Sequence, residues 1–137
     1  MSTMHSLALE LIYDTLTGYA GLSGTDIFSY VPGLPEGKPD EDFPYIVIGR
    51  DSARPFDTDS WNGLDLDIYV HVWSRYEGPK ETLELMDHIY TALHRTDLSI
   101  TGHTVVLNDL AFSQVLAPEN KTFHGVVRFR LIITEGS

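Results

Sequence analysis

The sequence predicts a single α+β domain over residues 1–137, in which a mainly antiparallel β-sheet packs with two α-helices. Three observations favour this fold class. The length of 137 residues suits one domain. Two segments carry apolar residues at helical spacing, and several others alternate apolar and polar residues, as strands with one buried face do. Their order, a helix, strands, a second helix and further strands, is typical of the α+β class.

The first predicted helix lies in the segment HSLALELIYDTLTGYAG, residues 5–21. Leu7, Leu11 and Leu16 recur near helical spacing, and glycines close to its end can terminate it. A loop-rich segment, residues 20–42, follows. It contains three prolines and several glycines, so it is expected to be extended or mobile, apart from a short strand around residues 27–31.

Two strands are predicted in the middle of the chain. Pro44 places the segment FPYIVIGR, residues 43–50, at a sheet edge or at the start of its strand. Residues 51–63 are expected to form a long polar connecting loop, and long loops are often functional. The clearest strand is GLDLDIYVHVWSR, residues 63–75, where apolar residues alternate with polar and aromatic ones. Its polar and aromatic face carries Asp65, Asp67, Tyr69, His71, Trp73 and Arg75.

The second predicted helix is GPKETLELMDHIYTALHR, residues 78–95. Pro79 suits its first turn, while His94 and Arg95 suit its C-terminal dipole. The apolar stripe expected to face the core consists of Leu83, Met86, Ile89, Tyr90 and Leu93.

Three more strands are predicted after this helix. They lie at about residues 99–107, 110–116 and 125–134. The segment APENKTFHG, residues 117–125, is expected to join the last two strands as a hairpin loop.

Composition excludes several classes of function. The chain has no cysteine, so disulfides, thiolate metal sites and cysteine nucleophiles are excluded. Twenty acidic and nine basic residues give a net charge of −11, and such a surface repels phosphate, so binding of nucleic acid through a basic footprint is not expected. No apolar run approaches the roughly 20 residues of a membrane span. The first residues also lack the basic region of a signal peptide.

Patterns for metal binding and catalysis are weak. No two of the six histidines have the i,i+4 spacing of a helical zinc motif, although sheet pairing could bring His71 close to His103 or His124. The segment DTDSWNG, residues 57–63, begins like a calcium-binding loop but lacks the later oxygen ligands and the required glycine. There is no GxSxG elbow and no Walker or dinucleotide pattern. No catalytic, metal-binding or cofactor-binding residue is therefore predicted.

Asp65 and Asp67 have two competing interpretations. They could form an acid/base pair, or they could pair with Arg128 and Arg130, which have the same i,i+2 spacing on another strand. Such cross-strand charge pairs stabilise a sheet by roughly 0.2–1 kcal/mol each. The structural interpretation is favoured, because a catalytic site needs several groups to converge.

The aromatic row of Tyr69, His71 and Trp73 needs a covering layer. The other face of the same strand is already apolar, so these side chains must pack under a helix of the same domain or under a neighbouring subunit. The sequence leaves both alternatives open, since the two helices could cover one face each or share a face.

Together, these segments resemble a known family. LALELIYDTLTGYAGLSG, FPYIVIGR, GLDLDIYVHVWSR, PKETLELMDHIYTALHR and FHGVVRFRLIITE are similar to the pattern of the tail-terminator, or tail-completion, proteins of long-tailed phages and phage-derived particles such as gene transfer agents. The strands resembling PYIVI and VHVWS carry most of the likeness, which extends from about residue 7 to residue 134.

The resemblance implies a structural virion protein, assembled in the host cytoplasm, with no catalytic residues and no cofactors. Family members form a homohexameric ring that ends tail-tube growth and joins the tail to the head connector. The implied partners are other copies of the chain, the tail tube protein and a head–tail connector or stopper protein, with DNA passing through the lumen without specific binding. An acidic lumen would keep DNA from adhering.

On this basis a set of interface residues is predicted. The hypothesis combines the connection at residues 51–63 with the aromatic row and the two arginines of the last strand. The residues are Asp51, Arg54, Phe56, Asp57, Asp59, Trp61, Tyr69, His71, Trp73, Arg128 and Arg130. The rival functions are a head-side neck connector or stopper, a small acidic enzyme using Asp65, Asp67 and His71, and a small regulatory adaptor.

Overall fold

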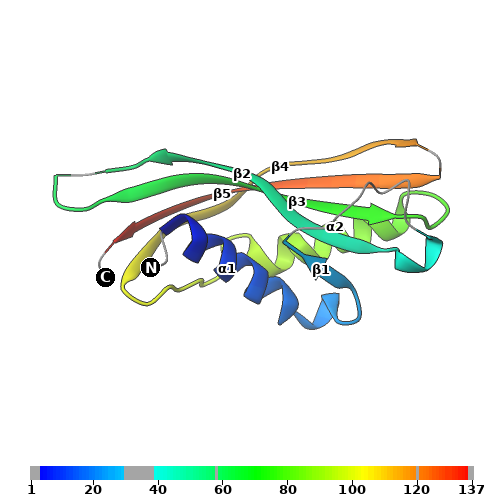
Figure 1. Ribbon diagram of the computed structural model, residues 1–137, viewed down its shortest axis with the longest axis horizontal. Helices are drawn as coiled ribbons and strands as arrows, with labels where there is room; N and C mark the ends of the chain where they lie inside the picture. Colours follow the sequence, from blue (N-terminus) through cyan, green and yellow to red (C-terminus); the bar gives the residue numbers. More distant parts are fainter. Residues whose placement is uncertain (1–3, 30–38, 58, 120, 136–137) are drawn as a thin grey trace.

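In the computed structural model, the chain folds into a five-stranded sheet with two α-helices (Figure 1). The structure describes residues 4–29, 39–57, 59–119 and 121–135. The α-helices are α1 (Met4–Thr17) and α2 (Lys80–Leu93), and short 3₁₀ turns lie at Ala20–Leu22 and Asp40–Asp42. The strands are β1 (Asp26–Phe28), β2 (Tyr45–Pro55), β3 (Gly63–Ser74), β4 (His103–Glu119) and β5 (Thr122–Glu135).

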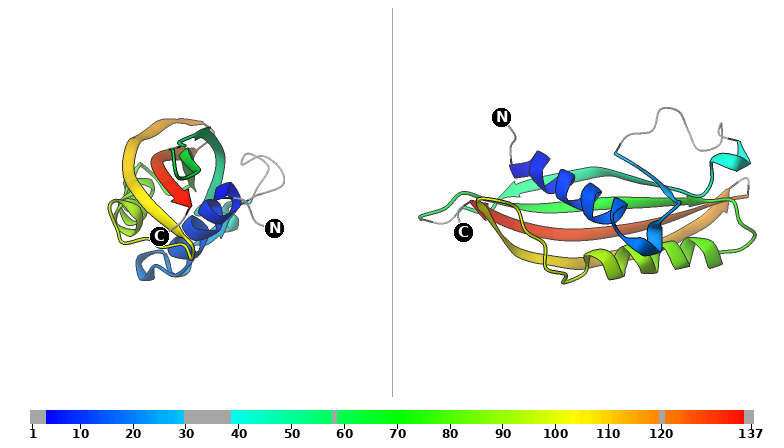
Figure 2. Two further views of the ribbon diagram at one scale, coloured as in Figure 1. Left: turned by 90° about the vertical axis from the view of Figure 1, so that its left-hand side faces the viewer. Right: turned by 90° about the horizontal axis from the view of Figure 1, so that it is seen from below.

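The strand order in the sheet is β1-β2-β3-β5-β4. β1 runs parallel to β2, and the other neighbouring pairs are antiparallel. The predicted α+β class with a mainly antiparallel sheet is therefore confirmed. Both helices lie on the same face of the sheet (Figures 1 and 2), which resolves the alternative that the sequence left open. We call the opposite face the open face.

The hydrophobic core fills the space between the helices and the sheet. Ile12 and Leu16 enter it from α1, and Ile89 and Leu93 enter it from α2. The sheet contributes the apolar side chains of its central strands, including Ile68 on β3. Amphipathic helices thus bury their apolar stripes against one side of the sheet, which is how such layers become stable. No helix in the described residues is long and apolar enough to cross a membrane.

One prediction on the C-terminal half was wrong. The strands expected at residues 99–107 and 110–116 are a single strand, β4, with register shifts between Val105 and Leu107 and between Leu110 and Phe112. The polar residues near its middle look like a turn in the sequence. Instead, the Asn108 side chain donates hydrogen bonds to the Leu93 and Thr96 carbonyls, so it fixes the strand to the end of α2.

Both predicted connecting loops are shorter than expected. β2 stays paired with β3 as far as the Pro55–Leu64 pair, so about half of the connection predicted at residues 51–63 is strand. β4 and β5 stay paired as far as Glu119 and Thr122, so most of the hairpin loop predicted at residues 117–125 is strand. In both places the backbone pairing overrides the loop-forming composition. Part of the loop-rich segment 20–42 and the end of the strand expected near residues 27–31 lie outside the described residues.

The core stripe predicted for α2 also needs correction. Met86, Ile89 and Leu93 are buried as expected, but Leu83 and Tyr90 are 46% and 41% exposed. Thr82, Leu85 and Ala92 are buried in their place. The helix therefore turns two large apolar side chains away from the core.

Candidate assembly interface

A charge cluster occupies the open face where β2, β3 and β5 lie side by side. Arg130 binds Asp65 in a bidentate manner, with nitrogen–oxygen distances of 3.0 and 2.7 Å. Arg128 Nε lies 3.4 Å from Asp67 Oδ1. In the β3–β5 register Arg130 lies opposite Asp67, and Arg128 lies opposite Tyr69, so each arginine reaches the aspartate two positions earlier on β3. The predicted cross-strand pairing of the two aspartates with the two arginines is confirmed.

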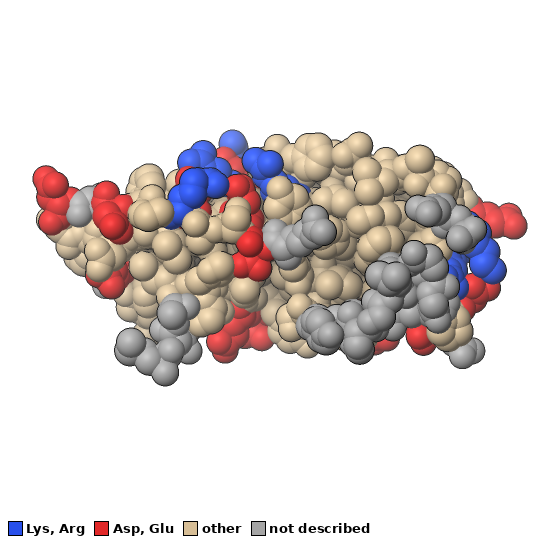
Figure 3. All heavy atoms as spheres, turned by 45° about the horizontal axis from the view of Figure 1, so that its top comes forward, with Lys and Arg blue, Asp and Glu red and all other residues tan. Residues whose placement is uncertain are grey.

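A third arginine, from β2, completes the cluster. Arg54 Nη1 donates to Asp67 Oδ2 at 3.1 Å, and Arg54 Nη2 lies 3.3 Å from Asp65 Oδ1. The two carboxylates therefore face three guanidinium groups, an excess of one positive charge at this point of an acidic chain. Figure 3 shows that basic and acidic side chains gather together on this side of the molecule.

Pairing with arginine keeps Asp65 ionised, although burial by itself opposes its charge. Asp65 and Asp67 are only 7% and 8% exposed. The hydrogen bond from Arg130 lowers the pKa of Asp65, and Arg54 lowers it further. In turn, Asp65 raises the pKa of Arg130. A carboxylate held in this way does not take up protons near neutral pH, which argues against the acid/base interpretation.

The aromatic row adjoins this cluster along β3. His71 Nδ1 and His124 Nε2 are hydrogen-bonded at 2.8 Å, and Trp73 stacks on His124 with ring centroids 3.7 Å apart. Burial, and then the neighbouring His71, lower the pKa of His124 to about 4, so this imidazole is neutral at physiological pH. Sheet pairing thus brings His71 to His124, which is one of the two histidines that the sequence allowed it to meet. Among the described residues, no three His, Asp or Glu side chains are placed to hold a metal ion.

A shallow hollow of about 500 Å³ lies over this row. Tyr69 and His71 contribute from β3, and His124 and Val126 from β5. The sequence-based interface set missed the contribution of β4, whose Phe112, Gln114 and Leu116 line the same hollow. Their i,i+2 spacing and the predicted hairpin between the last two strands were the available signals, but the predicted interface set did not use them.

The β2–β3 hairpin carries most of the remaining predicted residues. Phe56 and Trp61 at its tip are 37% and 48% exposed, and Asp59 is exposed beside them. Asp57 accepts a hydrogen bond from the Gly63 backbone N–H at 3.0 Å, which helps to close the tip. Asp51 lies apart from this group, because its carboxylate contacts His5 of α1.

The fold has an open sheet face with paired charges and partly exposed aromatic side chains, and comparisons with known proteins identify the class of protein to which it belongs. The model of the family described as tail completion protein gp17 matches residues 19–134. The tail completion protein gp17 of Bacillus phage SPP1 is 32% identical over 95 residues, which is 69% of this chain and 70% of that protein. The chain therefore belongs to the tail completion protein gp17 family, and the resemblance found in the sequence is confirmed.

Solved structures share the fold. The structure of the bacteriophage SPP1 gp17 protein matches with a TM-score of 0.59 and 26% identity, over 93% of this chain and 88% of that one. A chain of the virion of a native gene transfer agent particle matches with a TM-score of 0.74 and 18% identity, over 90% of this chain and 91% of that one. The family is one of structural tail proteins.

Proposed function

We propose that this tail completion protein works as a homohexameric ring of the virion. The ring caps the tail tube, ends its polymerisation and joins the tail to the head connector or stopper, while DNA passes through the lumen. Membership of the tail completion family carries this proposal. A ring of identical copies needs two different surfaces on each copy that fit each other.

The open face and the tip of the β2–β3 hairpin are the two surfaces that we assign to this contact. The tip presents Trp61 and Phe56 together with the acidic Asp57 and Asp59. The open face has an arginine excess next to an aromatic hollow. Aromatic residues and arginine are enriched at the centres of protein interfaces. The two surfaces are therefore complementary both in charge and in apolar character.

The acidic surface suits passage of DNA. A net charge of −11 on each copy, repeated around a ring, gives a strongly negative assembly. If part of this charge faces the lumen, it repels the phosphate backbone and prevents DNA from adhering.

The proposal is tested by native mass and by binding to tail tubes. We expect light scattering to give six times the chain mass at high protein concentration, or electron micrographs to show the protein at the ends of purified tail tubes. The variant Trp61→Ala should lower the assembled fraction at least tenfold without changing the melting temperature, because Trp61 is 48% exposed in the single chain.

Tyr76→Ala provides the matched control. Tyr76 is 52% exposed in the segment before α2 and belongs to neither proposed surface. Equal loss of assembly in both variants would contradict the assignment of the hairpin tip. A chain that neither forms a hexamer nor binds tube ends would contradict the ring itself.

A further inference from the structure

The outer edge of β4 has two halves with different surroundings. In the first half, the segment after α2 covers the edge. The Arg95 backbone N–H donates to the Asn108 carbonyl at 2.9 Å, and the Leu110 N–H donates to His94 Nδ1 at 2.9 Å. Within the described residues, no strand is paired with the outer edge of the second half, residues 111–117.

The uncovered half of β4 has little of the usual protection along its length, although register shifts lie at both of its ends and Pro118 follows it. It has the sequence AFSQVLA, without a charged residue or a proline. Soluble proteins normally place charges or prolines on an exposed edge strand, because its free N–H and C=O groups can pair with another chain. An uncharged edge of this kind can pair with a strand of another chain.

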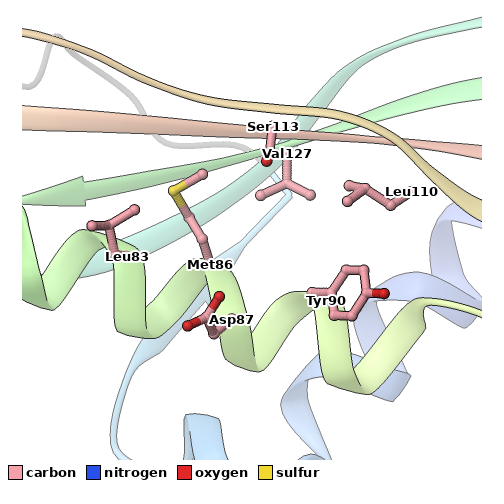
Figure 4. Close-up of a pocket in the computed structure, with 7 residues that line it drawn as sticks. All are labelled: Leu83, Met86, Asp87, Tyr90, Leu110, Ser113 and Val127. Atoms are coloured by element: carbon pink, nitrogen blue, oxygen red, sulfur yellow. The ribbon is translucent and has the colours of Figure 1, made fainter.

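Both faces of the sheet are hollowed beside this edge. On the helix side, a groove of about 240 Å³ runs between α2 and β4 (Figure 4). Leu83 and Tyr90, the two apolar residues that α2 turns away from the core, line it together with Ser113 of β4. On the open face, Phe112 and Leu116 border the larger hollow. Alternate side chains of an added strand would enter the two hollows in turn.

We infer that residues 111–117 of β4 bind an extended segment of a different protein, which adds a strand to the sheet. The segment has apolar residues at alternate positions and a lysine or arginine close to them. Asp87 lines the groove and supplies the matching negative charge. The inference is argued separately from the proposed ring, although the open-face hollow belongs to both proposed surfaces.

The size of the site also favours an extended segment. A stable contact between two folded proteins buries about 800 Å² on each partner. The free edge covers residues 111–117 only, which is less than half of β4. Backbone pairing along such an edge gives affinity to a flexible peptide, and the flanking hollows select its side chains.

A synthetic peptide tests the site in solution. The probe has nine residues that alternate valine and threonine between two terminal lysines, and the ¹⁵N-labelled full chain is observed by NMR. We expect the backbone amide signals of residues 111–117 to shift, with a dissociation constant of about 0.1–1 mM. A peptide with a central proline should bind at least tenfold more weakly, because proline removes a backbone donor and disrupts pairing.

Two charge variants distinguish binding of the peptide at this site from a general attraction between a basic peptide and an acidic protein. Asp87→Lys should weaken binding of the lysine-ended peptide about two- to fivefold. Glu84→Lys makes the same charge change on α2 outside the groove, at a side chain that is 60% exposed, and should have little effect. Signals remote from each substitution should stay in place, which verifies the fold.

Three outcomes would overturn the inference. The first is the absence of shifts in residues 111–117 at several millimolar peptide. The second is equal binding of the proline peptide. The third is a shift of the same amides on raising the protein concentration alone, which would assign the edge to a second copy of this chain.

Discussion

His124 illustrates how the position of a single side chain makes stability depend on pH. Its ring lies between Trp73 and His71, partly removed from water, and its pKa is lowered to about 4. In the unfolded chain a histidine titrates near its ordinary pKa of about 6.5. Between these two values the unfolded chain binds more protons than the folded chain, so the free energy of unfolding falls as the pH falls.

We therefore expect a loss of stability between about pH 6.5 and pH 4 that depends on this residue. After allowance for solvent screening of a half-buried ring, His124 accounts for about 1–2 kcal/mol of it. Urea unfolding at pH 7, 5.5 and 4.5 should show a flatter pH dependence for His124→Gln than for the natural chain. His103→Gln is the control, since His103 bonds to the Thr101 carbonyl on an exposed turn. An unchanged slope in His124→Gln would contradict this prediction.

At the residue scale the sequence predicted part of the candidate site. Alternation along β3 places Asp65 and Asp67 on one face, and the same spacing places Arg128 and Arg130 on one face of β5. The aspartates and arginines meet once these two strands are paired, and in the structure β3 is the neighbour of β5. Arg54 belonged to the predicted interface set, but its role as a third partner of the aspartates depends on the register of β2 against β3, which no local pattern specifies.

At the element scale the sequence predicted which segments form helices and strands better than it predicted where they end. β4 was divided in two because Asn108 and Asp109 are typical of turns, whereas the Asn108 side chain is bound to the end of α2. The core stripe predicted for α2 includes Leu83 and Tyr90 because both are apolar, although neither faces the core. Periodicity cannot tell a side chain that faces the core from one that faces a groove beside the sheet.

Contact between α2 and β5 depends on a residue without a side chain. A methyl group built on Gly125 would lie 2.6 Å from Met86 Sδ and 2.8 Å from Thr82 Cγ2, both on α2. Gly125→Ala should therefore push the helix from the sheet and lower the free energy of unfolding by about 1–3 kcal/mol. Chemical denaturation would measure this change.

Gly49→Ala is the matched control for this element-scale prediction. Gly49 lies on β2, and a methyl group there meets no atom within 4 Å. We expect a change within about 0.5 kcal/mol, or a slight gain, since alanine restricts the unfolded chain. Equal stabilities of the two variants would mean that α2 is not held against the sheet at Gly125.

At the scale of the whole molecule, the helices cover one side of the sheet and the open face is left for other contacts (Figure 2). Neither the sharing of one face by both helices nor the position of β4 at the sheet edge could be predicted from the sequence. Both depend on the order of the strands, which long-range pairing determines. The groove beside α2 and the uncovered edge of β4 follow from that order, so sequence analysis missed both.

The net charge of −11 is a property of the whole chain, and it opposes folding because acidic groups repel each other in the compact state. Salt screens this repulsion, with a Debye length of about 30 Å at 0.01 M and about 8 Å at 0.15 M. The buried Asp65 pair is screened less than exposed groups, so relief of repulsion should dominate. We expect the melting temperature to rise by a few degrees between these two salt concentrations. Glu10→Lys with Asp14→Lys, two exposed positions on α1, changes the net charge from −11 to −7 and should reduce the rise. A melting temperature that falls with salt would instead mean that attractive ion pairs dominate the electrostatics of the folded chain.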